Sequence, residues 1–274
     1  MMDSNFDWLV FTDIDGTLLN HHNYDVDAAL PALSQLESDN IPVILNTSKT
    51  YQELLRLIQK LDIRHPFIVE NGSAIFIPKG YFTKPILNKV DFPCTEIDDY
   101  WVLTLGEDLQ NLQKFIEQHD VKAVNFVSCS VSQAMALTGL NEEEAELAQT
   151  RLFSIPLSFD HLAKVKPFEK VVKDNGYKLL KGGRFHHLIG QVDKASAMEI
   201  LVKLYAFKYS KSFKKVCLGD SPNDLQMLQH ADIPIIVKSP SSDQPAIDHP
   251  QLIRTTHQAP KGWAEGISKL TLHY

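Results

Sequence analysis

The sequence contains few cysteines and no long hydrophobic run. Cys94, Cys129 and Cys217 are the only cysteines among the 274 residues, and none belongs to a CxxC motif. Three cysteines so far apart argue against a disulfide framework and are typical of a protein with reduced thiols. No stretch of about 18 apolar residues occurs, which excludes an ordinary transmembrane helix.

An excess of basic charge and an export signal are absent as well. The chain has 34 Asp and Glu against 27 Lys and Arg, and its formal net charge is −7. This balance disfavours nucleic acid and anionic membranes as partners. Residues 1–11 contain no basic segment followed by a long apolar run, so no secretory signal is indicated and we expect a cytoplasmic protein.

Toward both ends of the sequence, short apolar runs alternate with helical patterns. In chain order the expected elements are a strand at 8–11, a helix at 29–36, a strand at 41–45, a helix at 54–61, a strand at 66–69, a helix at 195–205, a strand at 215–218, a helix at 225–228, a final strand at 233–237 and a helix from about residue 261. Strands that alternate with helices predict parallel βαβ units, and therefore an α/β fold with a sheet covered on both faces.

The middle of the sequence has a different pattern. Between residues 84 and 189, Pro, Asp and Glu are frequent and the expected elements are shorter. They are strands at 100–105, 123–127 and 184–189, and helices at 109–116, 142–148 and 162–172. This mixture predicts an α+β domain at 84–189, inserted between core segments 1–83 and 190–274.

The motif Asp13-Ile14-Asp15-Gly16-Thr17 directly follows the first expected strand. In open parallel sheets, ligands bind beyond the carboxyl ends of the strands, so a site is expected here. Two carboxylates two residues apart can hold Mg²⁺, and Asp13 beside a bound phosphate can attack phosphorus. Asp15 can protonate the leaving oxygen and later activate water.

Two other interpretations of this motif are a simple strand-end turn and a calcium-binding loop. Asp and Gly are common in turns, so the first alternative stays open. A calcium loop is excluded, because Leu18 and Tyr24 stand where such a loop needs Gly and Glu.

Thr47 and Lys194 add two polar groups near expected strand ends. Thr47 can donate its hydroxyl to a phosphate oxygen, and it can also cap the helix expected from about Lys49. Lys194 opens a helix, where its charge opposes the helix dipole and requires a nearby anion or exposure to solvent. An ammonium there can offset the charge of a phosphate and of Asp13, although a lone lysine is usually a surface charge.

A second acidic loop, Gly219-Asp220-Ser221-Pro222-Asn223-Asp224, also follows an expected strand. Asp220 and Asp224 can complete an oxygen shell for Mg²⁺, directly or through water. Alternatively, Asp220 or Ser221 caps a helix and Pro222 occupies its first turn. Two acidic loops at two strand ends of one sheet favour the metal site.

In this order, the four motifs resemble those of the haloacid dehalogenase (HAD) superfamily of phosphohydrolases. The resemblance implies a Rossmann-like parallel-sheet core, with Asp13 as the nucleophile and Asp15 as the general acid and base. It also implies that Thr47 and Lys194 hold the phosphoryl group and that Mg²⁺ is the cofactor. The implied metal ligands are the Asp13 side chain, the Asp15 backbone carbonyl and Asp220, supported by Asp224 or Asn223.

An insertion between Thr47 and Lys194 is where this superfamily places its C2 cap, which usually selects the substrate. Shorter motifs resemble those of mannosyl-3-phosphoglycerate phosphatases, which release mannosylglycerate or its glucosyl relative. These motifs are Asn46-Thr47-Ser48-Lys49-Thr50, Glu70-Asn71-Gly72-Ser73-Ala74-Ile75, Gly182-Gly183-Arg184-Phe185-His186-His187 and Pro260-Lys261-Gly262-Trp263-Ala264. The resemblance implies a small phosphorylated sugar-glycerate as the substrate.

Seven side chains in the motifs are expected to bind this substrate: Ser48, Lys49, Glu70, Asn71, Arg184, His186 and Asn223. Arg184 can bind a carboxylate bidentately, or it can be a solvated residue of a glycine-containing hairpin. Adjacent histidines on a strand point to opposite faces, so His186-His187 is not expected to chelate a metal.

Three other functions stay open at this point. The chain can be another sugar phosphatase, of the sucrose-phosphate type or of broad specificity, or a phosphomutase that passes the phosphoryl group to a second sugar. A sugar-phosphate sensor without turnover is disfavoured, because a pure binding protein does not need both Asp13 and Asp15.

Overall fold

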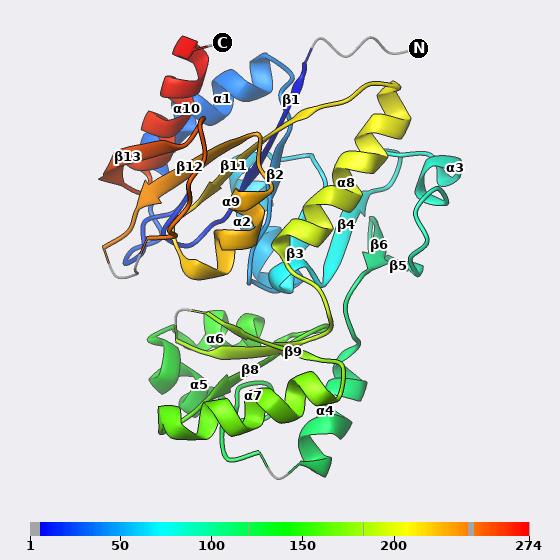
Figure 1. The fold of residues 1–274 in the computed structure, drawn as a ribbon, viewed down its shortest axis with the longest axis vertical. Helices are drawn as coiled ribbons and strands as arrows, with labels where there is room; N and C mark the ends of the chain where they lie inside the picture. The colour runs from blue at the N-terminus through cyan, green and yellow to red at the C-terminus, as the bar shows by residue number, and fades with distance from the viewer. Residues whose placement is uncertain (1–5, 120, 183, 241–243, 274) are drawn as a thin grey trace.

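A parallel sheet of five strands in the order β13-β12-β11-β1-β2 forms the centre of the upper lobe (Figure 1). The computed structural model describes residues 6–119, 121–182, 184–240 and 244–273. The strands are β1 (Trp8–Thr12), β2 (Val43–Leu45), β11 (Lys214–Gly219), β12 (Ile233–Lys238) and β13 (Ile253–Gln258). All neighbours in this sheet pair in parallel, so their carboxyl ends share one edge.

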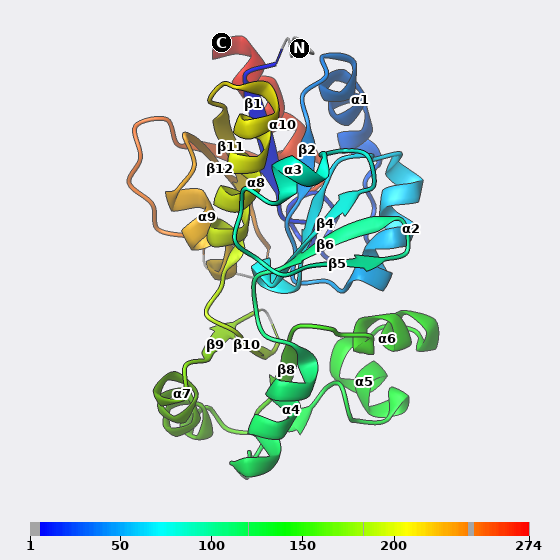
Figure 2. The ribbon, with the colours of Figure 1, turned by 90° about the vertical axis from the view of Figure 1, so that its right-hand side faces the viewer.

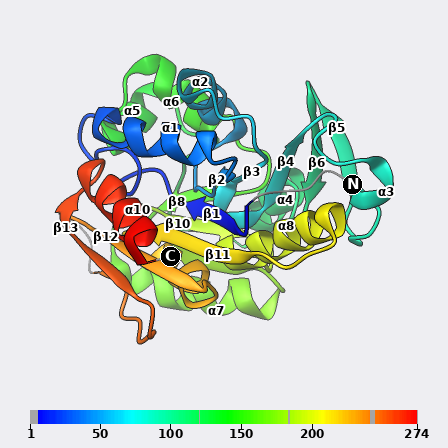
Figure 3. The ribbon, with the colours of Figure 1, turned by 90° about the horizontal axis from the view of Figure 1, so that it is seen from above.

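Helices cover both faces of this sheet, because alternate residues of each strand point to opposite sides. Val10 and Val216 pack with α1 (Leu30–Ser38), α2 (Tyr51–Leu61) and α10 (Lys261–His273) on one face. Leu9, Phe11 and Cys217 pack on the other face with α8 (Lys194–Tyr209) and α9 (Leu225–Gln229). Figure 3 shows these two helical layers from above. The predicted α/β class and parallel core are confirmed.

A second, antiparallel sheet in the order β3-β4-β6-β5 continues the upper lobe (Figure 2). It contains β3 (Phe67–Val69), β4 (Ala74–Pro78), β5 (Cys94–Ile97) and β6 (Tyr100–Thr104), with the short helix α3 (Lys84–Leu87) beside it. A parallel bridge from Asn46 to Ile68 joins β3 to the end of β2. Residues 84–104, which the sequence analysis assigns to the insertion, therefore pack with the core.

The lower lobe contains a third sheet, which is antiparallel and has the order β7-β8-β10-β9. Its strands are β7 (Val124–Asn125), β8 (Ile155–Ser158), β9 (Lys178–Lys181) and β10 (His186–Ile189). Its helices are α4 (Leu109–Gln118), α5 (Val131–Thr138), α6 (Glu142–Gln149) and α7 (Val165–Asp174). Side chains of α4 and α7 cover one sheet face through Phe115 and Phe168, which pack with Leu188. The predicted α+β character describes this lobe, and the predicted domain boundaries stay a prediction.

Four short 3₁₀ helices complete the described elements: η1 (Asp27–Ala29), η2 (Glu70–Gly72), η3 (Leu162–Lys164) and η4 (Pro222–Asp224). The chain crosses between the lobes twice, near Gly106 and Gly190. These crossings lie side by side, since a Cβ added to Gly190 would lie 3.1 Å from the Gly106 Cα. None of the helices in the described part of the chain has the length and hydropathy of a membrane span.

Candidate active site

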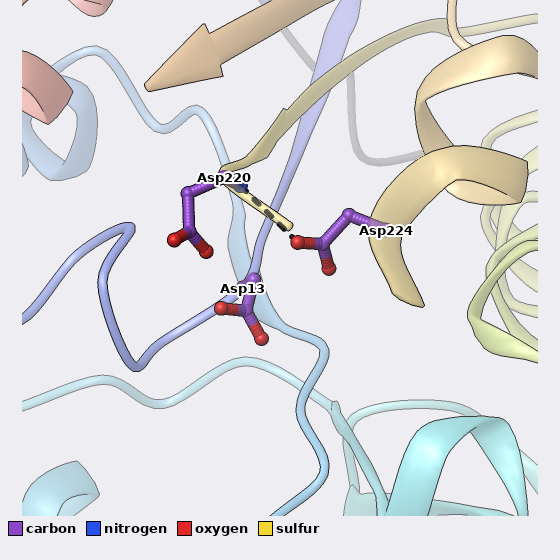
Figure 4. A group of neighbouring side chains, drawn as sticks. All are labelled: Asp13, Asp220 and Asp224. Carbon is purple, nitrogen blue, oxygen red and sulfur yellow. Dashed lines mark hydrogen bonds between the residues drawn. The ribbon is translucent and has the colours of Figure 1, made fainter. Parts of the chain in front are cut away.

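Three carboxylates gather at the carboxyl edge of the central sheet (Figure 4). Asp13 follows β1, Asp220 follows β11, and Asp224 ends η4 on the same loop. One oxygen of each lies within 4.8 Å of the others, and all three residues are buried. The parallel register of β1 and β11 brings the acids together, because Thr12 pairs directly with Leu218. Asp13 follows Thr12 by one residue, and Asp220 follows Leu218 by two.

Hydrogen bonds from neighbouring loops fix Asp220 and Asp224. Thr17 Oγ1 donates to Asp220 Oδ1 over 3.2 Å, and Ser239 Oγ donates to Asp220 Oδ2 over 2.8 Å. Asp224 Oδ2 accepts the backbone N–H groups of Asp220 and Ser221, each over 3.1 Å. These bonds leave the carboxylates little freedom to rotate, so their oxygens are already grouped before any ligand binds.

Lys194, the first residue of α8, brings a positive charge into the cluster. Its ammonium lies 2.5 Å from Asp13 Oδ1 and 2.7 Å from Asp224 Oδ1, and the residue is 1% exposed. The residue before it, Asp193, is the N-cap of α8. The anion that a buried lysine at a helix start requires is therefore present.

The cluster holds more negative charge than Lys194 balances. Burial raises the pKa of Asp13 above its ordinary value, and the carboxylates of Asp224 and Asp220 add to the effect although Lys194 opposes it. Burial and the Asp224 carboxylate raise the pKa of Asp220 to about 6. Burial alone would lower the pKa of Lys194, but Asp13 and Asp224 outweigh it and hold that pKa above its usual range. An additional cation would relieve this repulsion.

The donor set fits a hard divalent cation. Asp13, Asp220 and Asp224 offer oxygen atoms, which Mg²⁺ prefers to nitrogen or sulfur. The close approach of Gly16 is part of the arrangement, because a Cβ there would lie 2.7 Å from Asp220 Oδ2. The φ of Gly16 is +84°, a conformation that favours glycine.

Asp15, the candidate acid and base, is half-buried two residues after Asp13. Its Oδ2 forms an ion pair with Lys49 Nζ at 3.1 Å, while its Oδ1 is buried without a hydrogen-bond partner. Lys49 also pairs with Glu53 at 3.4 Å, and it lies 5.2 Å from the ring centre of Tyr24. Lys49 therefore reaches the predicted proton-transfer group directly.

Thr47 is fully buried after β2, and it does not cap the following helix. Thr50 is the N-cap of α2 and forms a capping box with Glu53. The Thr47 hydroxyl instead accepts the Lys49 backbone N–H over 3.2 Å, which leaves its own hydrogen available to an acceptor. The alternative of an N-cap role for Thr47, weighed in the sequence analysis, is thus replaced by a loop role beside the cluster.

Comparison with known proteins now identifies the family. The family model described as haloacid dehalogenase-like hydrolase matches residues 10–175. The chain belongs to this family.

Relatives of this HAD hydrolase extend over nearly its whole length. Two proteins named glucosyl-3-phosphoglycerate/mannosyl-3-phosphoglycerate phosphatase, from Persephonella marina and Methanococcoides burtonii, are 36% and 35% identical to it, each alignment covering 96% of both sequences. The crystal structure of a sucrose-phosphatase from Synechocystis has the same fold, with a TM-score of 0.63 at 15% identity over 98% of both chains. The chain is accordingly a phosphatase, a phosphoric monoester hydrolase of the HAD family.

Glu70 lies elsewhere in this HAD phosphatase than a substrate contact should. Its Oε1 accepts the backbone N–H of Leu152 over 2.9 Å, and its Oε2 accepts the N–H of Phe153 and the hydroxyl of Ser154 over 3.2 and 2.5 Å. Both carboxylate oxygens are therefore bound to the lower lobe. Glu70 thus forms a contact between the lobes, and its predicted role in binding substrate stays a prediction.

Asn71, in contrast, keeps its side chain free. It is fully buried with a φ of +60°, and neither its Oδ1 nor its Nδ2 has a hydrogen-bond partner. Its backbone N–H donates to Thr47 O over 2.9 Å, which holds it beside the loop that carries Thr47. Buried amides are nearly always paired in native proteins, so the free amide supports the predicted role of Asn71 in binding substrate.

The remaining predicted substrate contacts are distributed around the site of this HAD phosphatase. The Ser48 carbonyl accepts a hydrogen bond from Arg151 of the lower lobe over 2.8 Å. Asn223 is half-buried next to Asp224 and accepts a hydrogen bond from the Ser221 hydroxyl. Arg184 is exposed and donates to the Thr138 carbonyl, but its charge still acts on Tyr24 at the side of Lys49. Gly183 lies outside the described residues.

His186 points away from the upper lobe. Its ring contacts Phe159 edge-on with ring centres 5.6 Å apart, on the face of the lower sheet that α7 covers. The alternation of side chains on β10 thus places His186 on the face turned away from the carboxylate cluster, and its role in binding substrate stays a prediction.

Two groups near the site, Arg151 and Ser239, are not among the residues expected from the sequence, and of the two adjacent histidines only His186 is a predicted substrate contact. Ser239 follows β12 as a polar residue after an apolar strand, which is the same signal that identifies Asp13 and Asp220. Arg151 carries no local signal, because its role depends on the approach of α6 to the Ser48 loop. His187 differs from His186 only in the sheet face that it occupies.

Proposed function

We propose that this HAD phosphatase hydrolyses a glycosyl-3-phosphoglycerate to the glycosylglycerate and phosphate, with Mg²⁺ as cofactor and Asp13 as nucleophile. The observation that carries the chemistry is the buried Asp13 carboxylate, which has Lys194 at 2.5 Å and oxygens of Asp220 and Asp224 within 4.8 Å. The substrate rests on the two relatives of that name, which align over 96% of the chain.

In the proposed first step, an Asp13 oxygen attacks phosphorus and the P–O bond to the organic group breaks. Asp15 gives a proton to the departing oxygen, for which its unpartnered Oδ1 is suited. Lys194 and the Thr47 hydroxyl hold the phosphoryl oxygens and offset their growing charge. When bound, Mg²⁺ would be held by Asp13, Asp220 and Asp224, and would withdraw charge from the phosphoryl group.

In the proposed second step, water attacks the aspartyl-phosphate and Asp15 takes its proton. The P–O bond to Asp13 breaks, and phosphate leaves with Asp13 restored as a carboxylate. The Lys49 ammonium at 3.1 Å from Asp15 stabilises the ionised form of that carboxyl between the two steps. Two easier displacements thus replace one difficult hydrolysis.

We also propose that the lower lobe selects the organic group and that the enzyme acts in the cytoplasm on a small molecule. The lower lobe supplies Arg151 to the loop that holds Thr47, so a group bound between the lobes would contact both. The net charge of −7 gives no reason to expect a nucleic-acid partner.

A panel of phosphate esters tests the proposal. Phosphate release is measured with Mg²⁺ for glucosyl- and mannosyl-3-phosphoglycerate, sucrose 6-phosphate, simple hexose phosphates and p-nitrophenyl phosphate. The proposal expects kcat/KM for the glycosyl-phosphoglycerates to exceed that of every other ester by at least about 100-fold, since two anionic groups are then recognised. A flat profile, or a preference for sucrose 6-phosphate, would retain the phosphatase and discard this substrate.

A further inference from the structure

The two adjacent histidines of β10 face opposite sides of the lower sheet. His186 contacts Phe159 on the side that α4 and α7 cover, and Leu188, two residues along the strand, packs in the hydrophobic cluster on that same side. Figure 2 shows β9 and β10 at the top of the lower lobe, between these helices and the upper lobe. Since successive side chains of a strand alternate, His187 is directed toward the upper lobe.

His187 is buried there with an unsatisfied nitrogen. The residue is 6% exposed, and its Nδ1 has no hydrogen-bond partner. Among the described residues, the other buried side-chain atoms without a partner are Asp15 Oδ1, Asn46 Oδ1, and the two amide atoms of Asn71. All of these belong to loops that surround the carboxylate cluster.

Such a concentration of unpaired polar atoms requires an explanation. Buried polar atoms are nearly always hydrogen-bonded in native proteins, and the exceptions mark places that a ligand or water completes. Asn71 and Asp15 lie in the upper lobe and His187 in the lower one. A ligand that satisfies all three must therefore span the junction between the lobes.

The charges around His187 favour an anionic ligand group. Burial and, to a smaller extent, the positive charges of Arg151 and Lys194 together lower the pKa of His187 to about 3, so the ring is neutral. Arg151 is buried, donates to the Ser48 carbonyl and the Ser154 hydroxyl, and forms no ion pair with a carboxylate among the described residues. The charge of Arg151 acts on the buried Glu70 carboxylate through the Ser154 hydroxyl that both contact, but Glu70 already accepts three hydrogen bonds from residues 152–154. A ligand carboxylate could therefore supply the direct ion pair that a buried guanidinium usually has.

We propose that His187 binds the carboxylate of the substrate's glycerate group from the lower lobe, through an N–H at Nδ1, with Arg151 as the nearby charge. This inference rests on the proposed function, because it takes the phosphoryl group to lie at Asp13 and Lys194. It identifies His187, rather than its neighbour His186, as the specificity-determining histidine of the inserted lobe.

The test compares His187→Phe and His187→Asn with His186→Asn on two substrates. These are glucosyl-3-phosphoglycerate and the analogue in which the glycerate carboxylate is reduced to an alcohol. In wild-type enzyme kcat/KM should favour the carboxylate by about 10- to 100-fold, the usual worth of a hydrogen bond to a charged group. His187→Phe should abolish that preference, mainly by raising KM for the carboxylate substrate.

The other variants make the result specific. His187→Asn keeps a polar atom close to the position of Nδ1 and should retain part of the preference, whereas His186→Asn should retain all of it. Thermal melting of each variant checks that the fold is preserved. Equal losses on both substrates for His187→Phe, or a preference that moves with His186, would overturn the inference.

p-Nitrophenyl phosphate separates this inference from the proposed function. If wild-type enzyme hydrolyses that ester and the glycosyl-phosphoglycerate but His187→Phe keeps the preference for the carboxylate, only the role of His187 is refuted. If wild-type enzyme hydrolyses p-nitrophenyl phosphate without favouring the carboxylate, the substrate and the inference both fail. If it releases phosphate from neither ester, the proposed chemistry fails as well.

Discussion

At the scale of single residues, Asp13 combines properties that only a buried reactive group needs. It is 5% exposed, bound to an ammonium, and surrounded by two more carboxylates. Burying this much negative charge opposes folding, and a site with no function would replace it by neutral packing. This unfavourable burial of negative charge is explained if the carboxylates act on a phosphoryl group and a cation.

Asp13→Asn should reduce kcat by more than about 10⁴-fold, because an amide is a poor nucleophile and removal of a nucleophile has effects of this size. The fold should persist, since the amide keeps the size of the side chain and can still accept from Lys194. Phosphate release and circular dichroism measure the two effects. The exposed Asp27→Asn is the matched control, and activity retained by pure, folded Asp13→Asn would refute the nucleophile.

Removal of Mg²⁺ should lower the thermal stability of the protein more at neutral pH than at acid pH. The folded-state pKa values of Asp13 and Asp220 are raised, that of Asp220 to about 6. A raised folded-state pKa means that the site's contribution to apoprotein stability is present below the unfolded pKa and is lost as pH rises through the folded value. Mg²⁺ needs the ionised carboxylates, so it should bind more tightly as pH rises over the same range.

The increase in Tm on adding Mg²⁺ to chelator-treated protein should therefore be larger at pH 7.5 than at pH 5. Differential scanning fluorimetry measures it. Asp220→Asn should reduce the difference between the two pH values, and an increase that is equal at both would contradict the assignment of these acids to the metal.

At the scale of elements, the turn after β1 decides whether the acids can meet. Gly16 has a φ of +84° and no room for a Cβ, which would lie 2.7 Å from Asp220 Oδ2. The turn thus allows the Asp13 loop to lie directly against the loop after β11. Its glycine is needed for space as well as for conformation.

Gly16→Ala should cost about 1–2 kcal/mol from the left-handed backbone alone and also displace Asp220. Gly80→Ala is a close control, because Gly80 has a φ of +87° with no atom near a Cβ. Gly80→Ala should lose only the backbone part of this stability in urea unfolding and keep its phosphatase activity, whereas Gly16→Ala should lose at least as much stability and most of its activity. Normal activity in Gly16→Ala would show that Asp220 tolerates displacement.

At the scale of the whole molecule, Glu70 joins the two lobes. Its carboxylate, carried by η2 in the upper lobe, accepts three hydrogen bonds from residues 152–154 of the lower lobe. Burial raises the pKa of Glu70, although Arg151 and these donors oppose the effect. Next along the chain is Asn71, so the junction and the site share one short segment.

Glu70→Gln should loosen the junction, because an amide accepts at one atom only and leaves at least one buried donor unpaired, at a cost of about 1–3 kcal/mol. Hydrogen exchange at the Leu152 and Phe153 amides should become about 10- to 100-fold faster. Glu142→Gln, an exposed change on α6, should leave these rates as they are. Unchanged exchange in Glu70→Gln would mean that other contacts hold the lobes together.

The local pattern of the sequence by itself determined the main elements of the fold and the acids of the site. The strand-end acids, the α/β alternation and the α+β insertion are visible because parallel strands place their carboxyl ends together and hydrophobic periodicity shows each element. The hydrophobic pattern does not show β13, because Ile253 is its only apolar residue, or β5, whose residues are largely exposed.

Tertiary structure alone decided which side chains of the motifs are free to act. Glu70 and Asn71 are neighbours in one motif, yet the first is bound to the lower lobe and the second is unpaired. His186 and His187 are neighbours on one strand, yet they lie on opposite faces of the lower sheet. His186 is on the face that α7 covers, so only His187 is directed toward the upper lobe. Sequence identifies the residue type and the strand end, but contacts between distant segments determine whether its hydrogen bonds are already used.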